Sequence, residues 1–159
     1  MKFSPKDREL LKNIYNFAKA RKVKLYLVGG ILRDLMLGRE KVNPDFDFCL
    51  KRGAINFAKM LSKELKAGFV ILDKEHGACR VVKKMKHKIC TLDFTDFRGK
   101  TLEEDLLHRD FTINAIALEL EKVFTEPDLD NSLIDPYNGR VDLKQKIIKV
   151  VNKKAFPED

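Results

Sequence analysis

The chain has 159 residues and is 44% hydrophobic, enough for one globular domain with its own core. It contains no run of about 18 apolar residues, and its N-terminus lacks the apolar centre of a signal peptide. The sequence therefore predicts a cytoplasmic protein with no membrane span. The net charge of +8, with basic residues spread along the chain, suits either a polyanionic partner such as RNA or an ordinary lysine-covered surface.

Hydrophobic periodicity predicts an irregular alternation of helices and strands. The first helix begins with Ser4 as N-cap and Pro5 at its first position, and it ends at about Arg21. The elements expected after it are strand 23–28, helix 31–37, strand 45–50, helix 53–66, strands 69–72, 79–83 and 89–94, a helix opened by a Thr101–Glu104 capping box, a strand at about 115–120, helix 142–146 and strand 147–151. This order predicts an α/β (α+β) domain with a mixed, largely antiparallel sheet flanked by helices, rather than a doubly wound sheet.

Two aspartates, Asp45 and Asp47, alternate with phenylalanines in strand 45–50. Because side chains alternate between the faces of a strand, the two carboxylates share one face while the phenylalanines point into the core. Paired carboxylates suit hard divalent cations such as Mg²⁺. Asp93 is either a third, catalytic carboxylate beside this pair or an exposed acid on an edge strand. Asp96 has the opposite parity and is the weaker candidate.

A glycine pair, Gly29–Gly30, joins strand 23–28 to helix 31–37. It matches neither the dinucleotide fingerprint nor the P-loop pattern. Backbone N–H groups at such a turn suit a triphosphate, and Arg33 suits a charge-assisted hydrogen-bond fork to it. The alternative is a tight turn that requires a positive φ, with Arg33 paired to Asp34 or another carboxylate.

A second constellation comprises Arg109, Asp110 and Asn114, just before an apolar segment. Arg109 suits a phosphate, and Asn114 suits a ribose or another phosphate oxygen. The alternative for the Arg–Asp pair is a surface salt bridge. The cysteines and histidines lack metal-ligand spacing, so we expect buried free thiols and surface imidazoles. These residues are Cys49, Cys79, Cys90, His76, His87 and His108.

Four motifs in this order resemble the head domain of the class II tRNA nucleotidyltransferase (CCA-adding) and bacterial poly(A) polymerase family, within the polymerase β-like nucleotidyltransferases. The motifs are LVGGILRDLMLG (27–38), DFD (45–47), EDLLHRDFTINAIA (104–117) and DPYNGRVDL (135–143). The resemblance implies a nucleotidyltransferase head at 1–140 and the truncated start of a neck region at 141–159. It also implies template-independent transfer of CMP and/or AMP from CTP or ATP to the 3′-hydroxyl of tRNA or another RNA, with release of pyrophosphate. A poly(A) polymerase and a catalytically weak RNA-binding head are the alternatives.

The resemblance also implies roles for individual residues. Asp45 and Asp47 would hold two Mg²⁺ ions. The implied nucleotide-binding residues are Gly29, Gly30, Arg33, Arg109, Asp110, Asn114 and Asp159. Asp159 belongs to the start of the family's base-selecting motif, whose arginine lies beyond the last residue, so we expect this chain alone to bind nucleotide weakly and to select bases poorly.

Two positions depart from the family pattern. Only Arg-Gly-Lys-Thr-Leu stands between Phe97 and Glu103, whereas many relatives have a longer loop there that is tied to addition of the terminal A. The short loop resembles that of enzymes that add only CC. His108 stands where relatives usually have arginine, which predicts the loss of one phosphate or backbone contact.

Overall fold

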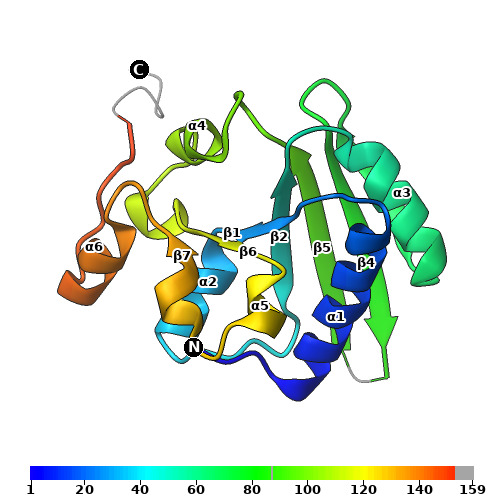
Figure 1. Cartoon of the computed structure of the whole chain (residues 1–159), viewed down its shortest axis with the longest axis horizontal. Coiled ribbons are helices and arrows are strands. Elements are labelled where there is room, and N and C mark those ends of the chain that lie inside the picture. Colours follow the sequence, from blue (N-terminus) through cyan, green and yellow to red (C-terminus); the bar gives the residue numbers. More distant parts are fainter. Residues whose placement is uncertain (87, 153–159) are drawn as a thin grey trace.

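A computed structural model describes residues 1–86 and 88–152 of the chain. Within these residues seven strands form one sheet in the order β3-β4-β5-β2-β1-β6-β7 (Figure 1). Strands β2 and β5 are parallel and the other neighbouring pairs are antiparallel, which confirms the predicted mixed, largely antiparallel sheet. The strands are β1 (Tyr26–Val28), β2 (Asp45–Leu50), β3 (Gly68–Asp73), β4 (Ala78–Met85), β5 (Lys88–Asp96), β6 (Ala117–Glu119) and β7 (Leu133–Ile134).

Two of the described α-helices begin at a side-chain cap that the sequence predicts. The Ser4 Oγ accepts a hydrogen bond of 3.2 Å from the Asp7 N–H, and the Thr101 Oγ1 accepts one of 3.2 Å from the Glu104 N–H, so both predicted N-caps are confirmed. The Glu104 carboxylate accepts from the Lys100 N–H instead of closing a box on Thr101. The helices are α1 (Pro5–Ala20), α2 (Gly30–Met36), α3 (Ala54–Glu64), α4 (Leu102–Leu107), α5 (Lys122–Thr125) and α6 (Gly139–Gln145), with 3₁₀ turns η1 (Thr112–Asn114) and η2 (Leu129–Ser132).

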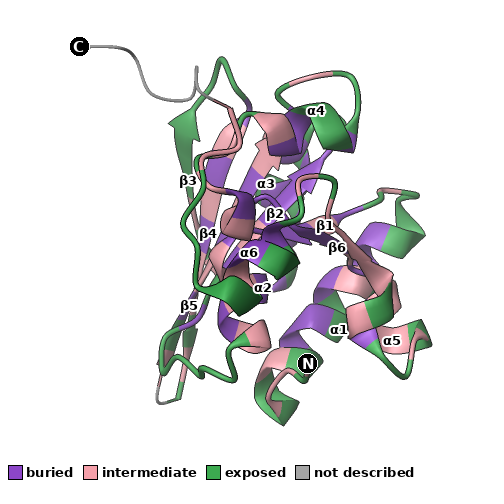
Figure 2. Cartoon of the chain, turned by 90° about the vertical axis from the view of Figure 1, so that its left-hand side faces the viewer, coloured by how far each residue is buried: buried purple, intermediate pink, exposed green. Residues whose placement is uncertain are grey.

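The two faces of the sheet have different neighbours. Phe46, Phe48 and Phe94 are buried on the face that α1 and α3 cover, and the rings of Phe48 and Phe94 stack with centroids 4.9 Å apart. The opposite face holds Asp47 together with a smaller apolar cluster that includes residues of α4. Figure 2 shows that the buried residues concentrate in the strands and on the helix faces that meet them. The period-two alternation of β2 thus places apolar side chains on the face buried in the larger core and carboxylates on the other face.

The C-terminal part differs from the sequence prediction. The last helix begins at Gly139 and ends at Gln145, where Lys146 adopts a positive φ of 59°. The predicted strand 147–151 is wrong, because this segment forms only an isolated bridge between Phe111 and Val150. The segment hydrogen-bonds to Asp110 and Thr112, and none of the seven strands in the described sheet pairs with it. The expected turn or short helix that leads into a strand near 115–120 is confirmed by η1 and β6.

The three cysteines are buried and free, as predicted. Burial raises the pKa of the Cys79 thiol to about 12, so this thiol is protonated at neutral pH. No helix among residues 1–86 and 88–152 is long and apolar enough to cross a membrane.

Candidate active site

The structure brings the three predicted carboxylates to one face of the sheet. Asp45 and Asp47 have the same parity on β2, and the parallel register places Asp93 of β5 directly opposite Asp47. The Asp45 side chain is 61% exposed, whereas Asp47 and Asp93 are half-buried. A one-residue slip of β5 would turn Asp93 to the other face, so the register is what assembles the group.

The carboxyl group of Asp47 has a shifted pKa. Burial raises the pKa of its carboxyl above the usual range, and the neighbouring Asp93 and Asp45 raise it further. Arg109 and Lys41 lower the pKa of the same carboxyl, but they do not outweigh burial. The ionised form of Asp47 is therefore disfavoured in this environment, and a cation bound beside it would stabilise the negative charge.

Asp93 is held by an arginine from the neighbouring strand. The Arg80 Nε donates to the Asp93 Oδ1 over 2.7 Å, and the Arg80 Nη2 donates to the Oδ2 over 2.8 Å. This bidentate pair fixes the orientation of the carboxylate and shares both of its oxygens. Asp96 serves elsewhere, because its Oδ1 accepts a hydrogen bond of 2.8 Å from the Ala54 N–H at the start of α3.

The Gly29–Gly30 turn lies against the carboxylates. Gly29 has a φ of 76°, as the turn interpretation predicted, and Gly30 is the first residue of α2. A Cβ atom on Gly29 would lie 3.2 Å from the Arg109 Nη1 and 3.3 Å from the Asp47 Oδ2. Both charged groups reach the turn because no side chain fills this space.

Arg33 of α2 is paired on two sides. Its Nε and Nη2 donate to the Asp34 Oδ1 over 3.2 and 3.0 Å, which is the pairing that the alternative of a tight turn allows for. Its Nη1 donates to the Asn114 Oδ1 over 2.7 Å. The Asn114 Nδ2 donates in turn to both carboxylate oxygens of Asp110, over 3.1 and 3.3 Å. The two sequence constellations are therefore joined in space by one chain of hydrogen bonds.

Sequence reasoning gave no role to Asp105, which the structure places at the base of Arg109. Its side chain is only 1% exposed, and its Oδ2 lies 3.7 Å from the Arg109 Nη2. Among the described residues, the Asp105 Oδ2 and the Arg109 Nε are buried without a hydrogen-bond partner. An acid four residues before an arginine, on the buried side of a short helix, was the signal that could have identified the pair.

A cavity of about 530 Å³ opens beside the carboxylates. Asp47, Asp93 and Arg109 line it, together with Arg98 after β5 and His76 from the β3–β4 turn. The imidazole Nδ1 of His76 lies 2.7 Å from the Asp73 Oδ2, and the side chain is exposed as predicted. His87 and Asp159 lie outside the described residues.

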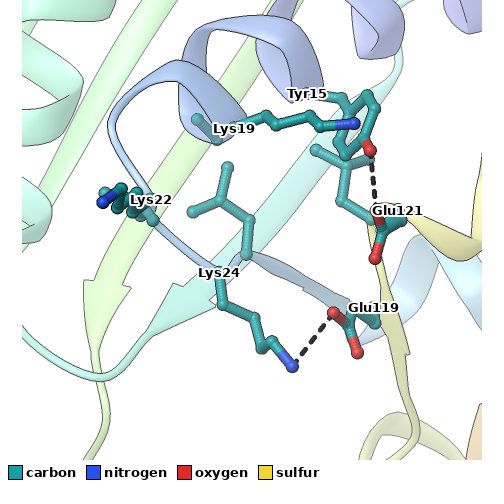
Figure 3. A pocket seen from close by; sticks show the side chains of 10 residues that line it. Tyr15, Lys19, Lys22, Lys24, Glu119 and Glu121 are labelled. Carbon is teal, nitrogen blue, oxygen red and sulfur yellow. Dashed lines mark hydrogen bonds and ion pairs between the residues drawn. The ribbon is translucent and has the colours of Figure 1, made fainter.

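A second, smaller cavity of about 200 Å³ lies between the C-terminal end of α1 and strands β1 and β6 (Figure 3). Its polar groups pair among themselves: the Tyr15 hydroxyl donates to Glu121 over 2.8 Å, and Lys24 lies 3.2 Å from Glu119. Asp47, Asp93 and Arg109 line the first cavity and not this one.

Comparisons with known proteins give matches over most of the chain. The family model described as "Poly A polymerase head domain" matches residues 25–149. The CC-adding tRNA nucleotidyltransferase of Synechocystis is 42% identical over 133 residues, which are 84% of this chain and 29% of that protein. The A-adding tRNA nucleotidyltransferase of Aquifex aeolicus is 32% identical over 148 residues, covering 86% of this chain and 17% of that protein.

Among solved structures, the Thermotoga maritima CCA-adding enzyme complexed with tRNA is 30% identical, with a TM-score of 0.79, over 99% of this chain and 36% of that one. The chain therefore spans less than a third of the length of the Synechocystis and Aquifex relatives.

Proposed function

The chain belongs to the family of poly(A) polymerase head domains. From that premise we propose that it transfers CMP, AMP or both from CTP or ATP to the 3′-hydroxyl of an RNA. The RNA we propose is a tRNA whose 3′ end is being built. One observation supports the proposal: the Asp47 carboxylate and the guanidinium groups of Arg109 and Arg33 all lie around the Gly29–Gly30 turn. Asp93 lies opposite Asp47 in the sheet, and Asn114 is hydrogen-bonded to Arg33.

The residues present fit a pair of Mg²⁺ ions. Burial and neighbouring carboxylates raise the pKa of Asp47, which is the electrostatic signature of a site that favours a cation. Among the described residues no three His, Cys, Asp or Glu side chains form a ready metal site, so Asp45 and Asp47 would hold the ions together with phosphate oxygens and water. Bound there, the ions would acidify the 3′-hydroxyl and neutralise charge on the pyrophosphate leaving group.

The protein's own groups position the reactants. We propose that Gly29, Gly30 and Arg33 hold the triphosphate, and that Arg109 adds a second positive charge against it. The 3′-oxygen attacks the α-phosphorus, the new O3′–P bond forms, and the bond to the β-phosphate oxygen breaks to release pyrophosphate. Asp93 is the proposed third carboxylate, oriented by Arg80. No protein nucleophile is required.

The sugar pocket is proposed to lie at Asp110 and Asn114. The Asn114 amide is oriented from both ends, because its oxygen accepts from Arg33 and its nitrogen donates to Asp110. The exposed carboxylate of Asp110 is then the acceptor available to a ribose hydroxyl. Asp159, outside the described residues, stays a proposed base-selecting residue.

The domain division at residue 140 also stays a proposal. Helix α6 crosses this position, and the Thr112 Oγ1 donates to the Asp142 Oδ2 over 2.6 Å. The first residues of the proposed neck region thus pack against the head.

Addition of CC alone is the finer form of the proposal. The segment between β5 and α4 is short, and the Synechocystis relative, at 42% identity, is named for CC addition. We also propose that this chain alone binds nucleotide weakly and selects bases poorly. Tight discrimination among CTP, ATP, GTP and UTP by this chain alone would contradict the expected weak base selection.

The test is incorporation of labelled CMP and AMP into a tRNA that lacks its 3′ end, with and without Mg²⁺. We expect Mg²⁺-dependent CMP incorporation that is lost in Asp45→Ala and Asp47→Ala. Glu9→Ala, which removes a carboxylate from α1, is the matched control and is expected to retain activity. Efficient AMP addition after CC would overturn the CC-only form, and no incorporation by the wild type at high enzyme concentration would overturn the transfer itself.

A further inference from the structure

Arg98 has no role in the mechanism above, yet it lines the same cavity as Asp47 and Asp93. It follows β5 directly, and its side chain is 42% exposed. Its backbone N–H donates to the Asp105 Oδ1 over 3.0 Å, and its Nε lies 3.5 Å from the same oxygen. Within residues 1–86 and 88–152, its two Nη atoms donate no hydrogen bond, so the outer edge of the guanidinium is available to a ligand.

Asp105 joins this arginine to Arg109. One carboxylate oxygen faces Arg98, while the other lies 3.7 Å from the Arg109 Nη2. The carboxylate is 1% exposed and contacts no solvent, so it cannot bind a ligand itself. A buried carboxylate between two arginines restrains both guanidinium groups and leaves their far edges toward the cavity.

The two arginines lie at different distances from the triphosphate pocket. Strand β1 is antiparallel to β2, so Gly29, which follows Val28, lies toward the Asp45 end of β2. Strand β5 is parallel to β2, and Arg98 lies five residues beyond Asp93, up to about 16 Å further along the strand direction. Arg98 is therefore on the side of the carboxylates away from the glycine turn.

In-line phosphoryl transfer needs one reactant on each side of the reacting phosphorus. The triphosphate side already has Arg33 and Arg109. The far side has acidic neighbours that are engaged elsewhere, since Asp96 caps α3 and Asp73 accepts from the His76 ring and backbone. Among the described residues that line this cavity, Arg98 is the arginine on the side where the second anionic reactant must arrive.

We propose that Arg98 binds a backbone phosphate at the 3′ end of the RNA, and that Asp105 is a positioning residue for both Arg98 and Arg109. This inference rests on the proposed transfer to an RNA end for the identity of its ligand. It adds a residue-level contact on the acceptor side, and it explains why an acid without solvent access is present between two arginines.

The test measures binding of a fluorescein-labelled single-stranded oligoribonucleotide ending in a 3′-hydroxyl to the 159-residue chain, by anisotropy over a range of KCl concentrations. Arg98→Gln is expected to weaken RNA binding about 10-fold at low salt, which is the loss of one charge-assisted hydrogen-bond contact. The slope of log K against log[salt] is expected to fall by about 0.7, the value for one phosphate on a single strand. CTP binding is expected to stay within about two-fold.

Lys59→Gln is the matched control, because it removes the same charge from the exposed side of α3 on the other face of the sheet. We expect it to leave RNA binding within about two-fold. Equal effects of Arg98→Gln and Lys59→Gln, or no RNA binding by the wild type, would overturn the inference. A loss of CTP affinity in place of RNA affinity would make Arg98 a triphosphate ligand and would also overturn it.

Asp105→Asn separates positioning from folding. It is expected to weaken both RNA and CTP binding, whereas in an Arg98→Gln background it should weaken CTP binding alone. Additive losses of RNA affinity in the double variant would exclude action through Arg98. If RNA binding depends on Arg98 while labelled CMP is never incorporated, the RNA contact stands and the proposed transfer fails, so the two failures are distinguishable.

Discussion

Replacing Gly29 with alanine should damage activity by more than its cost in stability explains. The residue has a φ of 76° and a ψ of −145°, a region nearly restricted to glycine, so alanine costs about 1–3 kcal/mol. For a chain of this length, a loss of about 2 kcal/mol lowers the melting temperature by about 4–8 °C. The new Cβ would also lie 3.2 Å from the Arg109 Nη1 and 3.3 Å from the Asp47 Oδ2, so both groups must move by tenths of an ångström.

The control for this variant is Gly38→Ala. Gly38 also has a positive φ, of 65°, but a Cβ there meets nothing within 4 Å. It is expected to lose about 1–2 kcal/mol through backbone strain alone. Thermal unfolding by circular dichroism gives the stability of both variants, and CMP incorporation below both melting temperatures gives their activity.

We expect transfer to fall about 10-fold or more in Gly29→Ala, because misplacement of reacting groups by less than 1 Å already costs much of the rate. Gly38→Ala should keep wild-type activity. If the two variants lose activity in proportion to their losses of melting temperature, the contacts of Gly29 with Arg109 and Asp47 have no separate effect on transfer.

Gly139, Asp47 and Arg80 are each open to a similar test. Gly139→Ala places a Cβ 2.1 Å from a backbone carbonyl oxygen of η1, so we expect the free energy of unfolding to fall by about 3 kcal/mol and the melting temperature by about 6–12 °C. In the control Gly68→Ala the nearest contact of the new Cβ is 3.8 Å, and the melting temperature should change by less than about 2 °C. Equal melting temperatures of the two variants would contradict this prediction. Because the folded-state pKa of Asp47 is raised, the metal-free chain should lose stability as the pH rises from about 4 through that pKa. In urea unfolding, the free energy of unfolding of Asp47→Asn should therefore rise relative to that of the wild type across this window, and Mg²⁺ should reduce the difference. A difference that does not change with pH would contradict this prediction. Arg80→Gln should lower the free energy of unfolding by less than about 1 kcal/mol, since its ion pair with Asp93 is partly exposed. It should lower kcat about 10-fold without changing the nucleotide affinity, because the Asp93 carboxylate is no longer held in place. An unchanged kcat would argue against a catalytic third carboxylate.

Features that depend on neighbouring residues were predictable from the sequence. The Ser4 and Thr101 caps and the shared face of Asp45 and Asp47 follow from local spacing, and the structure contains each of them. The residues that restrain the site were not predictable in the same way. Arg80 meets its acid across two strands, and the burial that isolates Asp105 is a property of the packed fold.

The wrong prediction of a strand at 147–151 also reflects contacts that form only in the folded chain. Its apolar residues satisfy the composition of a strand, but strand formation also requires a free partner. In the folded chain this segment meets Phe111 and the residues around η1, where space permits one bridge only. Short apolar runs are therefore the weakest basis for predicting the edges of this sheet.

The parallel pairing of β2 with β5 has a consequence for how the chain acquires its site. Asp47 and Asp93 face each other across a register that joins segments 46 positions apart, with α3, β3 and β4 between them. Closure of such a long loop is slow compared with formation of the intervening hairpin. The carboxylate face should therefore be completed among the last steps of folding. In a refolding experiment, the appearance of the proposed Mg²⁺-dependent nucleotide binding would then report that the native topology has formed.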